Sequence, residues 1–313
     1  MNSKLIKTVI EDTLTRHKST GEPVNNIVKE FTAKFRLGSR DRNLVNETIF
    51  NIFREKPWPN WFLELMKSQY NSEFHDLELS FRKRARPVLA VDLRFSSLMS
   101  TIEELKHQEI ECAFSKFSKN ALILSNHKVD LSKLEHCWWM NDGSQYVALQ
   151  IKSDATQFVL DLCAGKGGKT RIIMETGAKI TAIDINKNRL TLSKGVKCIN
   201  ADGRFFKSKQ LFDWILVDAP CSGTGTIRHA PDLFGRLKLA DIQKFAKLQT
   251  DLILNAAKLL KPSGILVYAT CSVLKQENHE YIEGLKLISN KQLLPNRDDT
   301  DGFYIANFCK ETN

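Results

Sequence analysis

The stretch LDLCAGKGGKT (Leu160–Thr170) decides the fold of the second half of this chain. An apolar segment with an acid and a cysteine runs into a turn rich in glycine and lysine. A buried strand followed by a glycine turn lets a ligand approach the backbone at a helix N-terminus. A P-loop is excluded because position 163 is Cys where that motif needs Gly, and the glycine spacing does not give GxGxxG. We therefore expect a ligand without a phosphate chain at this turn.

Short apolar runs alternate with helical patterns from this stretch onward. FVLDLC, KITAID, GVKCIN, FDWILVDA and GILVYAT are predicted strands, each followed by a predicted helix, and the fourth helix is expected to be long and to run through Leu260. Such alternation indicates a parallel sheet covered on both faces, in which ligands bind beyond the carboxyl ends of the strands. The residues expected at these ends are Cys163, Asp184, Asp202, Asp218, Thr270 and Cys271.

Two of these acids are suited to a nucleoside. Asp184 follows Asp161 by 23 residues, a position from which a carboxylate can accept hydrogen bonds from both ribose hydroxyls. Asp202 follows the third predicted strand and could accept from an adenine amino group. Either acid alone could instead cap a helix. A glycine turn with a ribose acid and an adenine acid, but no phosphate clamp, predicts S-adenosylmethionine rather than a dinucleotide as the cofactor.

Two cysteines are expected at the same sheet edge. Cys221 lies in VDAPCSGTG and Cys271 in YATCSVLKQEN, and the ordinary role of such a free cysteine is a buried, inert thiol. A thiolate that adds to C6 of cytosine would turn C5 into a nucleophile for a methyl group, and a base must then remove the C5 proton. Asp218 is the candidate for polarising the ring at N3. Lys169 could contact the base or hold Asp218.

The composition is that of a basic globular protein with more than one domain. The chain has 313 residues, of which 42% are hydrophobic and 26% charged, and a formal net charge of +10, which suits a polyanionic partner. None of its seven cysteines forms a CxxC pair, so we expect neither a disulfide framework nor a zinc site. No apolar run approaches a membrane span, and the start does not resemble a signal peptide. We expect a cytoplasmic monomer that binds neither membrane nor metal.

The first half of the chain has a different pattern. Apolar positions at three- and four-residue spacing predict helices over about the first 56 residues. Arg36, Arg40 and Arg42 form a basic cluster at a predicted helix entrance, either a solvated edge or a face that contacts phosphates. The strand-like VLAVDLRF, a helical stretch over Ser100–Gln108 and alternating segments near Ala113 and Ala121 predict a small α+β module.

In chain order, CAGKGGKT, AIDINKNRL, VDAPCSGTG, HAPD, YATCSVLKQEN and DGFYIANF resemble the motifs of the RNA cytosine-5 methyltransferases of the RsmB/NOP2/Sun family. LGSRDRNLVNETIFNIFRE resembles the NusB-like domain of its bacterial RsmB branch, and AVDLRFSSL resembles its small RNA-binding module. The resemblance implies an α/β, Rossmann-like S-adenosylmethionine-dependent methyltransferase domain over 141–313. An all-α NusB-like RNA-binding domain over 1–70 and a small α+β module over 71–140 would precede it.

The resemblance also implies roles for single residues. Cys271 would be the nucleophile and Cys221 the base that frees the product, while Lys169 and Asp218 would engage the target base. The implied cofactor contacts are Cys163, Ala164, Gly165, Lys166, Gly167, Gly168, Lys169, Asp184, Arg189, Asp202 and Asp218, and no metal ligands are implied.

Two departures from the family pattern stand out. The usual Ala-Pro of the glycine turn is Gly165–Lys166, which adds a charge near the cofactor. The usual RRxPD becomes RHAPD (228–232), which lacks one arginine and puts the substrate or loop contacts there in question.

The implied substrate is a cytosine of RNA, with 16S rRNA as the first choice. A tRNA cytosine-5 methyltransferase and a catalytically idle RNA-binding ribosome-assembly factor are the alternatives. A DNA cytosine-5 enzyme would use the proline-cysteine thiol as nucleophile and so reverse the roles of Cys221 and Cys271. The order of the motifs and the helical N-terminal part favour RNA.

Overall fold

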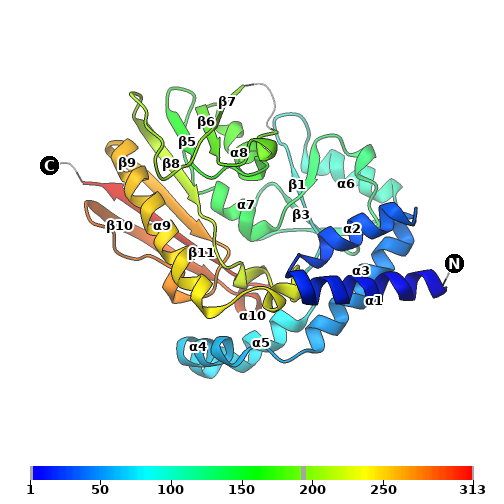
Figure 1. Ribbon diagram of the computed structural model, residues 1–313. Helices are drawn as coiled ribbons and strands as arrows, with labels where there is room; N and C mark the ends of the chain where they lie inside the picture. Colours follow the sequence, from blue (N-terminus) through cyan, green and yellow to red (C-terminus); the bar gives the residue numbers. More distant parts are fainter. Residues whose placement is uncertain (1–2, 192–194, 312–313) are drawn as a thin grey trace. The chain divides into compact units, whose positions relative to one another are not determined.

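Five helices form the N-terminal part of the chain, and the helices expected over the first 56 residues are confirmed. They are α1 (Ser3–Thr20), α2 (Val24–Lys34), α3 (Ser39–Glu55), α4 (Asn60–Tyr70) and α5 (Phe74–Arg82), in a computed structural model that describes residues 3–191 and 195–311 (Figure 1). Val9, Val28 and Ile49 are fully buried in the shared core of α1, α2 and α3. The apolar stripe read from the sequence is thus the packed face of these helices.

A segment from the second half of the chain completes this helical unit. The unit contains the described residues up to Arg84 together with Thr226–Asp241, which includes the 3-10 helix η6 (Pro231–Gly235). Asp232 accepts a hydrogen bond from the backbone N–H of Val24 (3.1 Å), at the first turn of α2. Three aromatic rings lie around Phe234, with centroids 4.7–6.4 Å away: Trp58, Trp61 and Phe62. The HAPD segment therefore belongs to the packing of the helical unit.

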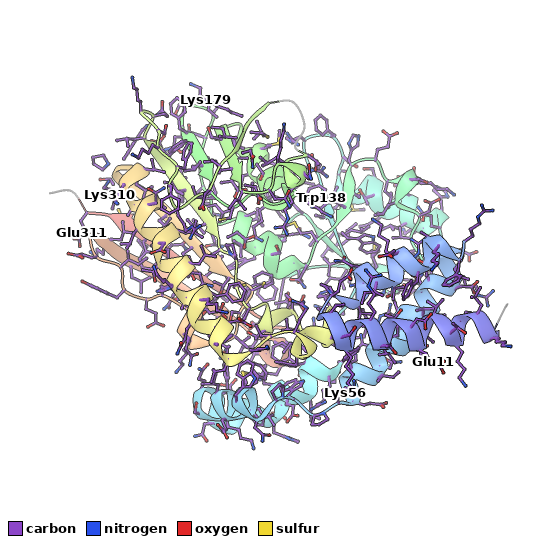
Figure 2. All side chains as sticks on the ribbon, in the orientation of Figure 1. Glu11, Lys56, Trp138, Lys179, Lys310 and Glu311 are labelled. Carbon is purple, nitrogen blue, oxygen red and sulfur yellow. The ribbon has the colours of Figure 1, made fainter. Side chains whose placement is uncertain are left out.

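The second unit, Ala85–Gly225 with Ile242–Asn313, begins with the expected small α+β module. Its elements are β1 (Val88–Val91), α6 (Leu98–His107), β2 (Cys112–Phe114), β3 (Ala121–Leu124) and β4 (Cys137–Trp139). The strands form an antiparallel sheet in the order β2-β3-β1-β4, and Leu105 of α6 packs with Leu89 and Leu122 of the sheet. Trp138 (labelled in Figure 2) packs with the apolar side chains beneath the large sheet.

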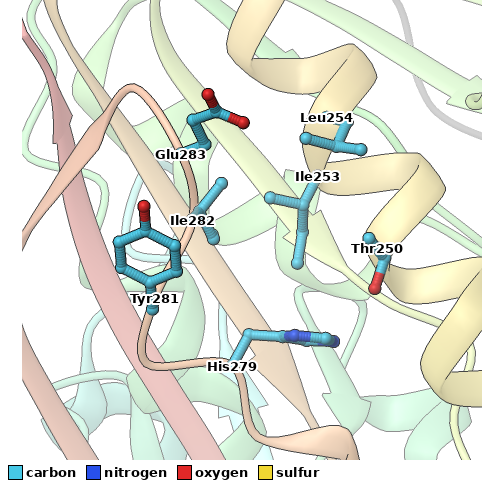
Figure 3. Close-up of a pocket in the computed structure, with 7 residues that line it drawn as sticks. All are labelled: Thr250, Ile253, Leu254, His279, Tyr281, Ile282 and Glu283. Carbon is cyan, nitrogen blue, oxygen red and sulfur yellow. The ribbon is translucent and has the colours of Figure 1, made fainter.

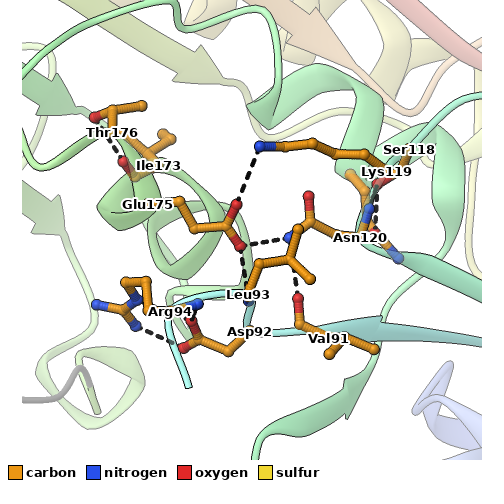
Figure 4. Close-up of polar contacts among 11 residues, drawn as sticks. Val91, Asp92, Leu93, Arg94, Ser118, Lys119, Asn120, Ile173, Glu175 and Thr176 are labelled. Carbon is orange, nitrogen blue, oxygen red and sulfur yellow. Dashed lines mark hydrogen bonds and ion pairs between the residues drawn. The ribbon is translucent and has the colours of Figure 1, made fainter. Parts of the chain in front are cut away.

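A buried carboxylate ties this module to the large sheet within the same unit (Figure 4). Glu175, in the 3-10 helix η3 (Met174–Thr176), accepts hydrogen bonds from the backbone N–H of Leu93 (3.2 Å) and from the side-chain amide of Asn120. The ammonium of Lys119 lies 3.6 Å from its other oxygen. Because Glu175 is almost fully buried, its charge depends on these donors.

The large sheet has seven strands. They are β5 (Phe158–Asp161), β6 (Lys179–Asp184), β7 (Val196–Asn200), β8 (Phe212–Asp218), β9 (Leu260–Thr270), β10 (Leu285–Leu293) and β11 (Phe303–Lys310). Their order is β10-β11-β9-β8-β5-β6-β7, and β5 to β9 form the expected parallel set. β11 is antiparallel to β9, and β10 to β11. The sequence thus predicts a Rossmann-like sheet correctly but misses its antiparallel edge.

Helices cover both faces of the sheet, which explains why its strands are continuously apolar. They are α7 (Asp142–Ala148), α8 (Gly168–Ile173) and α9 (Leu239–Leu259), followed by the short α10 (Pro295–Asp298). In β8, Ile215 and Val217 lie in a core with residues of α9, whereas Leu216 lies in a core with residues of α7 and α8. The long helix expected after the fourth strand is confirmed as α9 and ends at Leu259 (Figure 1).

The helices expected after three strands are wrong for the described residues. After β6 there is only the 3-10 helix η4 (Lys187–Arg189), after β7 there are turns, and after β9 the 3-10 helix η7 (Lys275–Glu277) precedes β10. The side chains of Asn186 and Asp202 accept hydrogen bonds from the backbone N–H two residues ahead (3.0 Å each). Such turns compete with a helix for the same backbone groups.

Replacement of Phe234 by alanine should destabilise the helical unit. Phe234→Ala removes a ring that three aromatic neighbours surround, so we expect a loss of about 2 kcal/mol in the free energy of unfolding. Denaturant unfolding measures it. Phe205→Ala, at a ring that is 70% exposed, is the matched control and should change stability by less than about 0.5 kcal/mol. Equal effects of the two substitutions would contradict the packing of Thr226–Asp241 in this unit.

Candidate active site

The candidate site lies where neighbouring parallel strands end. β9, β8, β5 and β6 are adjacent in the sheet, and parallel pairing brings their carboxyl ends to one edge. Cys271, Asp218, Cys163 and Asp184 stand at or directly after these ends. The structure therefore brings the predicted cofactor residues and the predicted catalytic residues to one side of the sheet.

The turn after β5 needs glycine at two positions. Gly165 and Gly167 have φ angles of 56° and 78°, a left-handed backbone conformation that residues other than glycine rarely adopt. Asp184 accepts from the backbone N–H of Gly165 (2.9 Å) with one oxygen and from that of Asn186 (2.7 Å) with the other. Asp184 thus holds the turn in place, and Lys166, the family departure beside it, is exposed.

A cavity of about 290 Å³ lies beside this turn. Four predicted cofactor residues line it: Cys163, Asp184, Arg189 and Asp202. Leu162, Leu248 and Leu252 add an apolar part to the wall. The other predicted cofactor residues, from Ala164 to Lys169 and Asp218, belong to the adjoining turn and to the end of β8. Two carboxylates around an apolar wall fit a ribose and a base.

Two acids near the cavity have shifted pKa values. The guanidinium of Arg204, 2.6 Å from Asp202, lowers the pKa of that carboxyl. Asp202 is therefore ionised and already paired, so an adenine amino group would share it with Arg204. Burial raises the pKa of Asp161 to about 7, although the hydroxyl of Thr170 donates to it (2.6 Å). Asp161 is thus partly neutral beneath the site.

The two motif cysteines are in contact. Sγ of Cys221 lies 3.3 Å from Sγ of Cys271, and both are free thiols. The hydrogen bond with Cys271 raises the pKa of the Cys221 thiol well above its ordinary value, with further contributions from burial and from the charges of Cys271 and Glu277. Cys221 is therefore a thiol at neutral pH, with its sulfur in contact with that of Cys271. Burial and nearby carboxylates also raise the pKa of Cys163, which makes that thiol inert.

An ion pair lies at the neighbouring strand end. Nζ of Lys169, near the start of α8, lies 2.6 Å from Oδ2 of Asp218, the last residue of β8. Both side chains are mostly buried. The pair offers an ammonium and a carboxylate, a donor and an acceptor, to a planar base with an amino group and a ring nitrogen.

Glu277 is a site residue that the sequence reasoning missed. It is fully buried, and it receives hydrogen bonds from the residues that follow both motif cysteines, Ser222 and Ser272. An acid seven residues after a strand end resembles an ordinary solvated helix residue, so only its place in the QEN of YATCSVLKQEN could have marked it.

A second cavity, of about 200 Å³, lies between α9 and the loop after η7 (Figure 3). Ile253 and Leu254 of α9 face His279 and Tyr281 across it. Burial lowers the pKa of His279, so its ring is neutral there. The predicted site residues do not line this cavity, and it is not part of the candidate site.

The described residues contain neither a cluster of metal-binding side chains nor a membrane-spanning helix. Within residues 3–191 and 195–311, no group of three or more His, Cys, Asp or Glu side chains is placed to hold a metal ion. None of the helices described is both long and apolar enough to cross a membrane.

The chain is similar to ribosomal RNA methyltransferases over most of its length. Residues 147–288 match the family model of the 16S rRNA methyltransferases RsmB/F. The chain is 30% identical to the probable ribosomal RNA small subunit methyltransferase B of Coxiella burnetii, over 90% of this chain and 74% of that protein. It is 33% identical to ribosomal RNA small subunit methyltransferase B of Yersinia enterocolitica, over 80% of this chain and 66% of that protein.

The fold has a counterpart among solved structures. NSun6 from Pyrococcus horikoshii, solved with SFG, superposes with a TM-score of 0.74 over 82% of this chain and 99% of that one. The two sequences are 19% identical, so this likeness bears on the fold alone.

The raised pKa of Asp161 predicts how stability depends on pH. The folded state binds more protons than the unfolded state between the ordinary pKa of 3.8 and the folded value of about 7, so stability falls as the pH rises through this window. Asp161→Asn removes the titration. As the pH rises through this window, the free energy of unfolding of the variant should increase relative to that of the parent by up to about 1.4 kcal/mol per pH unit.

Urea unfolding of parent and variant at several pH values from about 4 to 7 measures this difference. Asp12→Asn, at an exposed acid, is the control and should run parallel to the parent. Parallel curves for Asp161→Asn as well would contradict the assignment.

Proposed function

Because the chain belongs to the RsmB family of ribosomal RNA small subunit methyltransferases, we propose that it transfers a methyl group from S-adenosylmethionine to C5 of a cytosine in RNA, with 16S rRNA as the substrate. The observation that carries this proposal is the contact of two thiols, Cys221 and Cys271, beside the pair of Lys169 and Asp218. Cytosine C5 needs covalent activation before it can accept a methyl group. The two thiols can supply this activation, and the ion pair can hold the cytosine.

The cavity beside the glycine turn is the proposed cofactor site. Asp184 and Asp202 would take the ribose and the adenine amino group, and Cys163 and Arg189 would complete the wall. S-adenosylmethionine supplies the methyl group when bound. The turn from Ala164 to Lys169 would hold its amino-acid end near Asp218. Lys166, exposed in this turn, adds a positive charge that most suits a phosphate of the RNA or a carboxylate of the cofactor.

Cys271 would act as the nucleophile. The Cys221 thiol would donate a hydrogen bond to the sulfur of Cys271 and so stabilise the thiolate that attacks. This thiolate would form a bond to C6 of the cytosine, and the electrons of the 5,6 double bond would make C5 nucleophilic. The bond of the Cys271 sulfur to carbon removes the largest of the causes that raise the pKa of Cys221, and Cys221 would then give its proton to water.

Cys221 would then free the product. Its thiolate takes the proton from the methylated C5, the 5,6 double bond forms again, and the bond between C6 and the Cys271 sulfur breaks. Cys221 ends as a thiol and Cys271 as a thiolate, so the cycle closes with one proton released. The assignment needs two sulfurs within contact distance, and they lie 3.3 Å apart.

Lys169 and Asp218 would hold the ring while this happens. Addition at C6 places negative charge on N3 and O2 of the pyrimidine, and a nearby cation or proton donor stabilises that charge. The 2.6 Å contact between Lys169 and Asp218 keeps both groups in one place. The target base must leave its stack, since C6 is unreachable in a helix. The modules predicted over 1–70 and 71–140 would bind the surrounding RNA.

A trapping experiment tests the two thiol roles. Cys221→Ala should accumulate a covalent RNA–enzyme adduct in the presence of S-adenosylmethionine, because the base that triggers elimination is absent. Cys271→Ala should form no adduct. Denaturing gel electrophoresis with labelled RNA measures it. The reverse pattern would assign the attack to Cys221, as in the DNA cytosine-5 alternative, and two inactive but RNA-binding variants without any adduct would favour the assembly factor.

The choice of RNA is tested in cells. Bisulfite sequencing of RNA from a strain that lacks the gene should show one cytosine of small-subunit rRNA that loses its methyl group. The parent gene should restore the mark and the Cys271→Ala gene should not. Loss at a tRNA position, with the rRNA unchanged, would support the tRNA alternative.

A further inference from the structure

One buried carboxylate lies beneath both thiol loops. Glu277, in η7, has no exposed surface and accepts four hydrogen bonds. One oxygen receives the backbone N–H of Ser222 (2.8 Å) and the side-chain amide of Gln249 (3.0 Å). The other receives the hydroxyls of Ser222 and Ser272 (2.5 Å each). Both oxygens of this buried carboxylate are therefore engaged by donors of the protein.

The two serines are the direct neighbours of the two cysteines. Ser222 follows Cys221 after β8, and Ser272 follows Cys271 after β9. Their hydroxyl oxygens lie 3.2 Å apart, and each lies 3.1 Å from the hydroxyl of Thr224. Glu277 therefore joins the two loops at the first residue beyond each sulfur.

We propose that Glu277 is a positioning residue, which holds Ser222 and Ser272 with one carboxylate and so keeps the sulfurs of Cys221 and Cys271 in contact. The proposal rests on the function proposed above. Glu277 does not line the cavity of the proposed cofactor site, and it acts through the two serines. A displacement of about 1 Å between reacting groups can lower a rate by about a hundredfold. Correct positioning of the two sulfurs can therefore offset the cost of burying the carboxylate of Glu277.

The charge of Glu277 also acts on the thiol of Cys221. The hydrogen bond with Cys271 and burial raise the pKa of Cys221 most, and the charge of Glu277 adds to them. Tyr268 also lies near Cys221, and its hydroxyl donates to the backbone oxygen of Glu277 (2.7 Å). A neutral side chain at 277 would therefore release the proton of Cys221 at lower pH. This consequence separates Glu277 from a residue that only fills space.

The test compares Glu277→Gln and Glu277→Asp with Glu175→Gln, which makes the same amide change at a buried carboxylate remote from the thiols. The first measurement needs no RNA. Full-length protein is alkylated with iodoacetamide over a range of pH, and the peptides that carry Cys221 and Cys271 are quantified by mass spectrometry. For Glu277→Gln, the midpoint for Cys221 should fall, because the variant lacks a charge that helps to raise the pKa of this thiol. For Glu175→Gln the midpoint should stay at the parent value.

The second measurement is the rate of adduct formation in the Cys221→Ala background, which reports on the position of Cys271 alone. Glu277→Asp keeps the charge but shortens the reach to the serines, so the rate should fall by about tenfold or more. Glu277→Gln should fall similarly, and Glu175→Gln should stay within about twofold of the parent. If Glu277→Gln does not fold, Ser272→Ala, which removes one of the two hydroxyl links, should lower the rate in the same direction.

The outcomes separate this proposal from the proposed function. A parent rate of adduct formation and an unchanged Cys221 midpoint in Glu277→Gln would overturn the role of Glu277. A lowered unfolding midpoint with unchanged thiol titration and adduct rate in the folded protein would likewise reduce Glu277 to a packing residue. A Cys221→Ala protein that traps no RNA would instead overturn the proposed function, while the alkylation shift would still decide whether Glu277 sets the thiol pair.

Discussion

The parallel pairing of β8 with β9 is the constraint on which the site depends. In this register Asp218 lies opposite Ala269, so the chain leaves both strands at the same level. Cys221 and Cys271, 50 residues apart in the chain, then come within 3.3 Å. Without that register the serines that follow them could not share one carboxylate. The alignment of β8 with β9 therefore brings the two sulfurs together, and the loops that follow complete the site.

The acids at this edge of the sheet differ in their burial and in the groups that balance their charge. Asp161, Asp218 and Glu277 are three acids at or after the ends of the strands of this edge, and each has different partners. Asp218 has the ammonium of Lys169 at 2.6 Å, Glu277 has four hydrogen-bond donors, and Asp161 has one hydroxyl and a pKa raised to about 7. A partly protonated Asp161 leaves the cation to Asp218. Asp161 and Asp218 would repel each other if both were ionised in a medium of low polarity.

The sequence predicts the parts of this protein that rest on local patterns, and it fails where long-range contacts decide. The strands that carry Asp161 and Asp218 are apolar runs, and their parallel order and the acids at their ends follow from that pattern. β10 is exposed and polar along most of its length, so no apolar signal marks it as an edge strand. Glu277 likewise gains its role from partners far along the chain. Burial of a charge is a tertiary property, which a single sequence does not display.

The loop that carries Cys221 passes into the helical unit within a few residues. Its own backbone, however, is held by hydrogen bonds within the second unit. Before the passage, the backbone N–H of Ala219 donates to Ala269 (2.9 Å) and that of Gly225 to the carbonyl of Cys271 (2.9 Å). Gly225 fits because a Cβ there would lie 2.0 Å from the carbonyl oxygen of Gly302. The loop is thus fixed at both ends on β9 before residue 226 enters the helical unit.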